Sequence, residues 1–327
     1  MKMKAAIQAG ADGLRIQETE RPNPGHDEVL VRVRACGLNR ADIGMAAGHA
    51  HGSLGGPGTP LGMEWAGEVA EVGPGVTEFK PGDRVMGSGK GAFAEYAVAD
   101  KGRILPVPSA TMSFEQAATL PIALLTMHDA LVTNGRLQRG DSVLIQGAST
   151  GVGLMGLQIA RFKGAGLVIG SSTTAERRAR LGEFGAQLAI DTKDEQWPQQ
   201  VLDATGGKGV HLIVDQLSGT QANNNMRAAA VLGRIVNVGR LAGTRAEFDF
   251  DLHALKRIHY IGVTFRTRSV QEVRDIVSRV RSDLGEAIAS GQLGLPIDRC
   301  FPFEQAAEAL ATMSRNTHFG KLVLSLA

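Results

Sequence analysis

The 327-residue sequence is short of several residue types, and each shortage excludes a class of protein. It holds only two cysteines, Cys36 and Cys300, which lie far apart in the chain. Two distant cysteines cannot form the disulfide framework of a small secreted domain, or a zinc lobe built from several cysteines. We therefore expect a reducing, cytoplasmic location.

Long apolar runs and an excess of one charge are missing as well. No stretch approaches the ~20 apolar residues that a transmembrane helix needs. The first residues, MKMKAAIQAG, turn polar too early for the apolar core of a signal peptide. The formal net charge is +2, and the lysines and arginines are scattered along the chain. We therefore expect neither a membrane nor a nucleic acid as a partner.

Hydrophobic residues (43%) and 42 glycines are abundant, as in a turn-rich α/β protein with two domains. Residues 1–121 are predicted to be mostly β, because short apolar segments alternate with glycine and proline turns, which is typical of a small barrel or sandwich. The glycine-rich segment 48–58 is predicted to be a loop of the kind that often borders an active site. The predicted strands of this part are 29–34, 65–73, 84–86 and 93–98.

From residue 122 onward, apolar strands alternate with helical segments, which indicates a doubly wound parallel sheet. Residues 122–292 are therefore assigned to a nucleotide-binding domain inserted into a first domain of residues 1–121 and 293–327. The cleft between the two domains is the expected active site. The predicted strands are 143–145, 167–172, 189–191, 210–215, 234–239, 260–265 and, back in the first domain, 321–324; the predicted helices include 122–131, 175–184 and 303–313.

A strand, a glycine turn and a helix follow one another in residues 141–160, DSVLIQGASTGVGLMGLQIA. Such a unit lets the backbone approach a pyrophosphate, which the free N–H groups of the helix N-terminus then bind. The spacing departs from G-x-G-x-x-G at Thr150, so a glycine-rich turn without chemical function is the alternative. The alternation of strands and helices that follows favours the nucleotide-binding interpretation.

Three further stretches, CGLNRAD at 36–42, LGMEWAGEV at 61–69 and LPIALLT at 120–126, complete a pattern in which the whole chain resembles the medium-chain dehydrogenase/reductase superfamily. Within it, the chain is most similar to the zinc-free quinone oxidoreductase (zeta-crystallin-like) branch. The resemblance implies an α/β fold with a GroES-like β-barrel catalytic domain and a Rossmann domain with a six-stranded parallel sheet.

The chain departs from the zinc alcohol dehydrogenases at the positions of their catalytic zinc ligands. Asn39 and Met63 stand where those enzymes have cysteine and histidine, and neither an amide nor a thioether replaces such a ligand for zinc. Cys36 is interpreted as a buried core thiol, and His49 and His51 as solvated loop histidines. We expect no metal.

The end of the second nucleotide-domain strand bears on the choice of cofactor. An enzyme that prefers NAD places an acid there for the ribose hydroxyls, whereas this chain reads IGSSTT at 169–174, with no acid before Glu176. The hydroxyls of Ser171 and Ser172, followed by Arg177 and Arg178, suit a 2′-phosphate, and Arg177 matches the basic residue of similar reductases. The alternative is a helix cap beside a solvated basic face. The predicted cofactor is NADPH.

The resemblance also implies roles for residues elsewhere in the chain. Asn39 and Thr126 match positions at the nicotinamide end and are the predicted catalytic residues. His128 is interpreted as structural, and Tyr96 is left open between the pocket and the barrel core. The remaining predicted cofactor contacts are Ser149, Thr150, Gly151, Val152, Val238, Gly239, Arg240, Phe265, Arg266, Arg315 and Lys321.

The resemblance implies an NADPH:quinone oxidoreductase-like enzyme, in which hydride transfer reduces a quinone or an α,β-unsaturated carbonyl compound, with Asn39 as a donor to the developing oxyanion. Gly44 and Ala46 replace a tyrosine and an arginine of some quinone reductases, which leaves the acceptor open. An enoyl-thioester reductase and a non-catalytic NADPH-binding protein are the alternatives. We expect a homodimer that pairs through the strand at 260–265.

Overall fold

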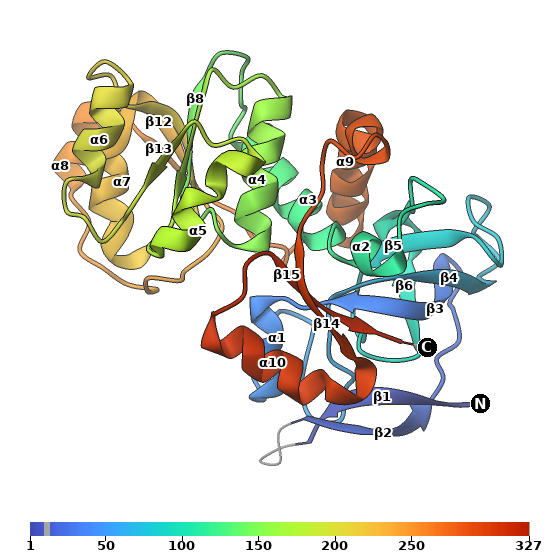
Figure 1. Ribbon diagram of the computed structural model, residues 1–327. Coiled ribbons are helices and arrows are strands. Elements are labelled where there is room, and N and C mark those ends of the chain that lie inside the picture. The colour runs from blue at the N-terminus through green and yellow to red at the C-terminus, as the bar shows by residue number, and fades with distance from the viewer. Residues whose placement is uncertain (10–13, 327) are drawn as a thin grey trace. The chain divides into compact units, whose positions relative to one another are not determined.

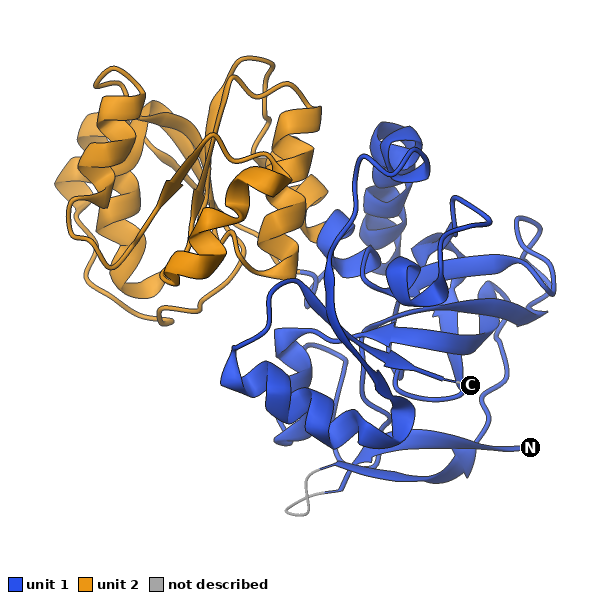
Figure 2. Ribbon diagram, in the orientation of Figure 1, with its two compact units in different colours: residues 1–125, 265–327 blue, residues 126–264 orange. Residues whose placement is uncertain are grey.

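The computed structural model describes residues 1–9 and 14–326. The chain divides into two units (Figure 2): unit 1 comprises Met1–Leu125 and Phe265–Ala327, and unit 2 comprises Thr126–Thr264. The inserted segment is therefore shorter than the 122–292 expected from the sequence, because residues 265–292 group with unit 1. Within the described residues, no helix combines the length and the apolar character needed to cross a membrane.

Unit 1 is built on a seven-stranded sheet in the order β14, β15, β3, β4, β5, β7, with β6 paired to β3 (Figure 1). All neighbours are antiparallel except β14 and β15. A separate antiparallel pair, β1 and β2, contacts the segment just before β6 through an isolated bridge from Ala5 to Ala94. The strands are β1 Lys2–Gln8, β2 Leu14–Glu20, β3 Glu28–Gly37, β4 Glu64–Val72, β5 Arg84–Ser88, β6 Tyr96–Asp100, β7 Ile104–Pro106, β14 Ile297–Pro302 and β15 Lys321–Ser325.

The strand expected at 93–98 is displaced in the structure, where β6 begins at Tyr96. Phe93 instead lies in the core, and its N–H donates to the carbonyl of Leu61 at 2.8 Å. The side chain of Tyr96 packs against the cluster around Met3 in unit 1, with the guanidinium of Arg21 4.7 Å from its ring centre.

The helices of unit 1 are α1 Arg40–Ala46, α2 Phe114–Ala118, the start of α3 Pro121–His128, α9 Val270–Ala289 and α10 Ala306–Arg315. Helix α10 buries Ala306, Ala309, Leu310 and Met313 in the barrel core, at the spacing of one helix face. The helix expected at 303–313 begins as a 3₁₀ turn over Phe303–Gln305 before α10.

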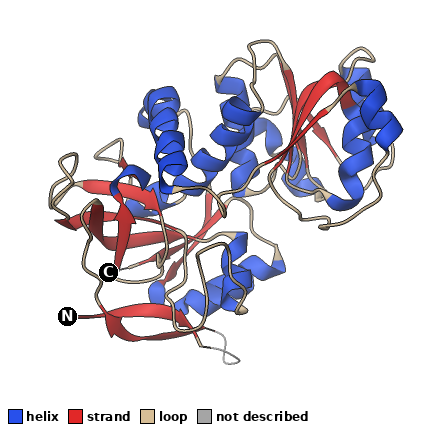
Figure 3. Ribbon diagram, turned by 180° about the vertical axis from the view of Figure 1, so that it is seen from behind, coloured by secondary structure: helices blue, strands red, loops and turns tan. Residues whose placement is uncertain are grey.

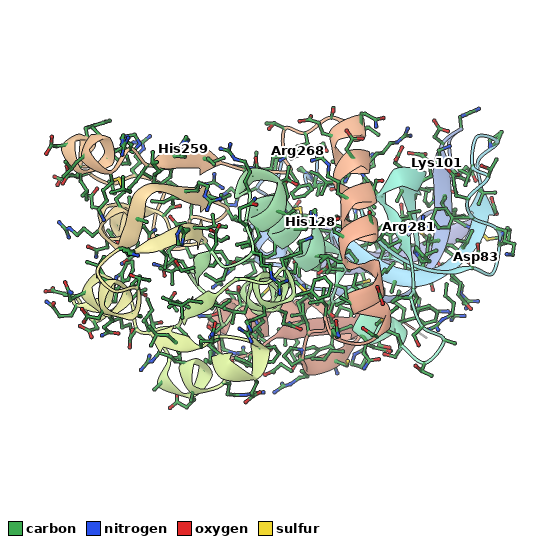
Figure 4. All side chains as sticks on the ribbon, turned by 90° about the horizontal axis from the view of Figure 1, so that it is seen from above. Asp83, Lys101, His128, His259, Arg268 and Arg281 are labelled. Atoms are coloured by element: carbon green, nitrogen blue, oxygen red, sulfur yellow. The ribbon has the colours of Figure 1, made fainter. Side chains whose placement is uncertain are left out.

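Helix α9 packs on unit 1, which explains the changed domain boundary. Arg274 donates two hydrogen bonds to Asp100, at 2.9 and 2.6 Å, and its stem lies where a side chain at Gly102 would stand. Arg281 lies further along the same helix (Figure 4). Because Arg274 and Asp100 are 174 positions apart, the sequence around α9 does not reveal this partner.

Unit 2 contains an all-parallel sheet in the order β10, β9, β8, β11, β12, β13, as the sequence predicts for a doubly wound fold. Figure 3 shows helices on both sides of these strands. Leu144, Ile169, Ile213 and Ile235 fill its centre. The strands are β8 Ser142–Ile145, β9 Leu167–Ser171, β10 Leu188–Ile190, β11 Val210–Asp215, β12 Ala229–Asn237 and β13 His259–Gly262, and the helices are α4 Gly151–Phe162, α5 Ala175–Ala179, α6 Trp197–Ala204, α7 Ala222–Ala228 and α8 Phe250–Lys256.

Three elements of this region differ from their expected bounds. Helix α3 gives way after His128 to a π-helical turn over Asp129–Asn134. The helix expected at 175–184 is α5 followed by a 3₁₀ turn, Leu181–Phe184, because the N–H of Arg180 bonds to the carbonyl three residues back instead of four. Strand β13 ends at Gly262, short of the expected residue 265.

Candidate functional site

The glycine turn of unit 2 has the geometry of an anion-binding site. Thr150 is the N-cap of the twelve-residue helix α4, and its Oγ1 accepts the N–H of Gly153 at 2.9 Å. The N–H groups of Gly151 and Val152, in the first turn, have no partner within a helix. A side chain at Gly153 would collide with Ala148, so glycine is required for this close packing. The turn therefore fits a pyrophosphate at the positive end of the helix.

Two glutamines that were not predicted from the sequence hold this turn in place. Gln216 follows β11; its Nε2 donates to the carbonyls of Gln146 and Gly147 at 2.9 and 3.3 Å, and its Oε1 accepts from Thr150 Oγ1 at 3.2 Å. Gln146 follows β8 and its Oε1 accepts from Ser171 Oγ at 2.6 Å. Both glutamines are buried. A polar residue directly after a buried strand was the available signal, because the carboxyl ends of parallel strands share one edge of a sheet.

The two serines at the end of β9, Ser171 within the strand and Ser172 directly after it, have different environments. Ser171 is 1% exposed, and its hydroxyl accepts the N–H of Gly147 at 2.9 Å while it donates to Gln146. It therefore supports the turn from behind. Ser172 donates to Ser149 at 3.1 Å, so these two expected contact residues lie together beside the turn. Arg177 lies half-buried on α5.

The loop after β12 lies beside the end of β11 at this edge. The N–H groups of Val238 and Gly239 both donate to the carbonyl of Asp215, at 2.8 and 3.1 Å. A side chain at Gly239 would stand 2.5 Å from the carbonyl oxygen of Gln216. Arg240 is exposed beside them. The structure thus brings the expected residues at 149–152, 171–172 and 238–240 to the same edge of one sheet.

The buried Asp215 and the half-buried Tyr260 form a further polar pair at this edge, with 3.5 Å between the Tyr260 hydroxyl and Asp215 Oδ2. The carboxylate of Asp215 accepts the N–H groups of Leu217 and Ser218 at 2.8 and 2.9 Å, and burial raises its pKa. Burial, together with the nearby Asp215, raises the pKa of Tyr260 to about 12. Ser218 has a φ of +56°, which is unusual for a residue with a side chain, and its hydroxyl donates to the carbonyl of Gly239.

Unit 1 contains a second candidate region, a buried cluster of charged and polar groups. The ammonium of Lys321, from β15, donates to the carbonyl of Leu38 at 2.8 Å, to Asn39 Oδ1 at 3.2 Å and to Glu64 Oε1 at 2.5 Å. Lys321 is 4% exposed and Glu64 is fully buried. Glu64 also accepts from Asn39 Nδ2 at 2.9 Å and, through Oε2, from the N–H of Ile122 at 2.8 Å. Every N–H of the ammonium therefore has an acceptor.

Asp42 lies beside this cluster without an ammonium of its own. Its Oδ2 accepts the N–H of Asn39 at 2.7 Å, while its Oδ1 has no hydrogen-bond partner among the described residues. Burial raises the pKa of Asp42 to about 7; Glu64 adds to the increase, and the N–H of Asn39 and the charge of Lys321 oppose it. Cys36 is fully buried nearby and its thiol donates to the carbonyl of Ala92, as expected for a core cysteine.

The other expected site residues belong to other segments of the chain. Thr126 is half-buried on α3, and His128 is fully buried on the same helix. The backbone of Arg266 lies against Gly52 of the glycine-rich loop, where burial and the Arg266 charge lower the pKa of His51. Phe265 is half-buried in the same segment as Arg266, and Arg315 is exposed at the end of α10, where it donates to Thr312.

Two family models match the chain. One, described as the alcohol dehydrogenase GroES-like domain, matches residues 25–109, and the other, described as zinc-binding dehydrogenase, matches residues 151–281. A quinone oxidoreductase of Rattus norvegicus is 30% identical over 321 residues, which cover 97% of this chain and 95% of that protein. The chain belongs to the medium-chain dehydrogenase/reductase superfamily.

Further relatives of this medium-chain dehydrogenase/reductase include a solved structure of a Pseudomonas syringae quinone oxidoreductase, 27% identical, with a TM-score of 0.87 and all of both chains covered. A mycocerosic acid synthase-like polyketide synthase of Mycobacterium tuberculosis is 29% identical over 333 residues, and the match covers 100% of this chain. The chain spans only 15% of the length of that synthase. Membership of this superfamily implies a nicotinamide cofactor, and the glycine turn and its backbone N–H groups fit one.

The name of one matching family model refers to zinc, but the residues of this medium-chain dehydrogenase/reductase do not fit that metal. Asn39 and Met63 offer an amide and a thioether in place of zinc ligands. The acceptor oxygens of Asn39 and Glu64 already surround the ammonium of Lys321. The described residues also contain no group of three or more His, Cys, Asp and Glu side chains that could hold a metal ion.

Proposed function

We propose that this protein is an NADPH-dependent oxidoreductase that reduces quinones or α,β-unsaturated carbonyl compounds by zinc-independent hydride transfer. The observation that carries the proposal is the Lys321 ammonium, because it places a tethered cation among the oxygens of Asn39 and Glu64. The reaction must then depend on positioning and hydrogen bonding rather than on a Lewis acid.

NADPH is favoured over NADH by the residues that follow β9. Ser172 and Arg177 offer a hydroxyl and a guanidinium, which suit a 2′-phosphate, and neither Ser172 nor Thr173 is an acid that would bind both ribose hydroxyls. The pyrophosphate would lie on the N–H groups of Gly151 and Val152, which the Gln216 and Ser171 hydrogen bonds hold toward the cofactor.

When bound, the reduced nicotinamide supplies a hydride. The hydride forms a C–H bond at the β-carbon of an enone, the C=C electron pair shifts to a double bond between the α-carbon and the carbonyl carbon, and the C=O electron pair moves to the carbonyl oxygen. A proton from water at the α-carbon then completes the saturated product, and until that step the negative charge lies mainly on the carbonyl oxygen. Asn39 is the proposed donor to that oxygen: one N–H of its amide is bonded to Glu64, and the other makes only a long 3.4 Å contact with the carbonyl of Gly37. The hydroxyl of Thr126 is the second proposed donor.

The test is NADPH oxidation, followed by absorbance, against 1,4-benzoquinone, 9,10-phenanthrenequinone and a series of short enones, with NADH in parallel. Turnover that is faster with NADPH supports the proposal. Arg177→Ala should weaken NADPH binding much more than NADH binding. Tight NADPH binding without turnover of any quinone or enone would contradict the proposed reaction.

A second candidate is an enoyl-thioester reductase, which is favoured by the 29% identity of the whole chain to a segment of a polyketide synthase. The chemistry is the same hydride addition to a C=C bond next to a carbonyl. Crotonyl-N-acetylcysteamine, a small enoyl thioester, distinguishes the two candidates, because turnover of it without turnover of quinones would assign the thioester reaction. An NADPH-binding protein without any of these activities is the remaining outcome.

The edge of the unit 2 sheet is the proposed homodimer interface. Strand β13 is the last strand in the sheet order and leaves one backbone edge unpaired among the described strands. A shallow apolar groove beside it is lined by residues that include Phe248, Phe250 and Tyr260, and Phe250 is 76% exposed. His259, labelled in Figure 4, lies on this strand. Antiparallel pairing of two β13 strands would cover the edge and the groove.

A further inference from the structure

A partly buried ion pair joins the ends of the two strands beside the proposed adenosine end of the cofactor. One guanidinium nitrogen of Arg178, Nη1, donates both to the carbonyl of Ser172 at 2.8 Å and to Asp191 Oδ2 at 2.9 Å. Ser172 directly follows β9 and Asp191 directly follows β10. The side chains of Arg178 and Asp191 are 25% and 29% exposed. Because one nitrogen bonds both oxygens, the Asp191 carboxylate is a close neighbour of the end of β9.

The position of Asp191 matters because the end of the second strand is where a dinucleotide-binding sheet meets the adenosine ribose. A free carboxylate there accepts hydrogen bonds from the ribose hydroxyls of NADH and repels the 2′-phosphate of NADPH. Asp191 lies 13 residues after Arg178, well beyond the stretch up to Glu176 in which an acid of the second strand is expected. The fold thus brings to this edge an acid that would favour NADH if its charge were not compensated.

We propose that Arg178 determines cofactor specificity indirectly, because it neutralises Asp191 and so lets the 2′-phosphate approach Arg177. Asp191 accepts one further hydrogen bond, at Oδ1 from the N–H of Lys193 at 3.0 Å, which holds the carboxylate but adds no full charge. Helix α5, which carries Arg177 and Arg178, has one acidic residue, Glu176, and it is exposed. This inference rests on the proposed NADPH binding and names the residues that set the preference.

Arg178→Ala should convert the neutral pair into an uncompensated carboxylate next to the phosphate. Because the carboxylate is partly buried, water and salt screen its charge less than they would on the open surface. We therefore expect NADPH affinity to fall at least about tenfold, while NADH affinity changes less than about twofold or rises. Asp191→Asn removes the carboxylate and keeps the size of the side chain. The double variant should therefore recover most of the lost NADPH affinity, although it lacks the arginine.

The experiment measures Kd values of NADPH, NADH and 2′-AMP by titration calorimetry for the wild-type chain, Arg178→Ala, Asp191→Asn and the double variant. 2′-AMP carries the discriminating phosphate without the pyrophosphate or the nicotinamide, so it reports this end of the cofactor alone. Arg180→Ala is the matched control: it removes an arginine two residues away, whose carboxylate partner is Glu183 at 3.1 Å. This control should leave all three Kd values nearly unchanged.

The outcomes separate three explanations. Selective loss of NADPH and 2′-AMP binding in Arg178→Ala, with recovery in the double variant, supports neutralisation. Selective loss without recovery would show that Arg178 contacts the phosphate itself and would overturn the inference. Equal loss of NADPH and NADH would make Arg178 merely structural and would also overturn it. A wild-type chain that binds NADPH and NADH equally would overturn the proposed cofactor and this inference together, and the wild-type titration alone reveals that failure.

Discussion

Replacing Asp42 with asparagine should stabilise unit 1, and by more at alkaline than at acidic pH. Burial raises the pKa of this carboxyl from its ordinary value of 3.8 to about 7. Between these two values the folded state holds a proton that the unfolded state has lost, so the free energy of unfolding falls as the pH rises. The carboxylate costs stability wherever the unfolded chain is ionised, and this cost levels off above about pH 7.

The size of the effect follows from the two pKa values. A shift of one pKa unit corresponds to about 1.4 kcal/mol. Between about pH 5 and pH 8, the wild-type chain should therefore lose about 2 to 3 kcal/mol of stability that the Asp42→Asn variant keeps. Asparagine preserves the acceptor for the Asn39 N–H at the start of α1, so the helix cap remains.

The two tryptophans make the measurement specific to one unit. Trp65 lies in the core of unit 1 and Trp197 in the core of unit 2. In a Trp197→Phe background, Trp65 fluorescence during urea unfolding follows the unfolding of unit 1 alone. The free energy of unfolding of unit 1 is then obtained without assuming that both units unfold in one transition. The difference in unfolding free energy between Asp42→Asn and its parent is then compared at several pH values.

Glu272 provides the control, because it holds the same position in the capping box of α9 but is exposed. Hydrogen bonds from Ser269 lower the pKa of Glu272, so its contribution to stability is present above its ordinary pKa of 4.5 and is lost as the pH falls. Glu272→Gln should therefore show no pH trend relative to its parent between pH 5 and pH 8, and a weak trend of opposite sign only below about pH 4.5. If Asp42→Asn and its parent lose stability in parallel from pH 5 to pH 8, Asp42 does not titrate in this range and the reasoning is refuted.

Three further predictions concern charge, backbone strain and assembly. Lys321→Met leaves the buried Glu64 carboxylate uncompensated and should cost unit 1 about 3–5 kcal/mol, measured by Trp65 fluorescence; adding Glu64→Gln should recover much of the loss. Leu232 has a φ of +61°, so Leu232→Gly should stabilise unit 2 by roughly 1 kcal/mol in a thermal or urea titration. Phe250→Asp places a charge in the proposed interface and should shift the protein from dimer to monomer in light scattering at micromolar concentration.

Each of these predictions has a contrasting measurement. If Lys321→Met alone retains wild-type stability, the ammonium does not compensate Glu64. Val231 lies one residue earlier and has no positive φ, so Val231→Gly should lower the stability of unit 2. If both glycine variants raised the stability equally, backbone strain at Leu232 would not be the cause. Phe162→Asp, also at an exposed aromatic residue of unit 2, should leave the assembly unchanged. A wild-type chain that is already monomeric would refute the proposed dimer.

Much of the fold could be predicted because its evidence is local. About twenty consecutive residues hold the apolar run before Gly147, the glycine turn and the helical repeat after it. They predict a buried strand, a phosphate-binding turn and a helix, respectively. Strand bounds were less accurate where backbone pairing decided them, as at Phe93, whose N–H bonds to Leu61 instead of extending β6. The sequence around helix α9 does not reveal its contact with Asp100, because Arg274 and Asp100 are 174 positions apart.

The site shows the same limit. The sequence named Lys321 as a cofactor contact, but its acceptor Glu64 lies 257 positions away, so only the folded chain reveals that the ammonium is buried beside a carboxylate. Ser171 was named for its hydroxyl, which the structure shows bonded to the glycine turn and to Gln146. Residue type and spacing therefore indicated where polar groups gather. They did not indicate which of these groups the protein uses to hold itself together.

The bond from Lys321 to the carbonyl of Leu38 spans 283 positions and has a consequence for how the polypeptide folds as it is synthesised. The ribosome completes the entire chain of unit 2 before it adds Lys321, so the parallel sheet can form on the nascent chain. Until the last part of the barrel is synthesised, Glu64 has no Lys321 ammonium to pair with and β3 has no β15 to bond along that edge. Closure of the barrel is thus a late step, and exposure of its half-built core to chaperones should last as long as translation of the inserted unit.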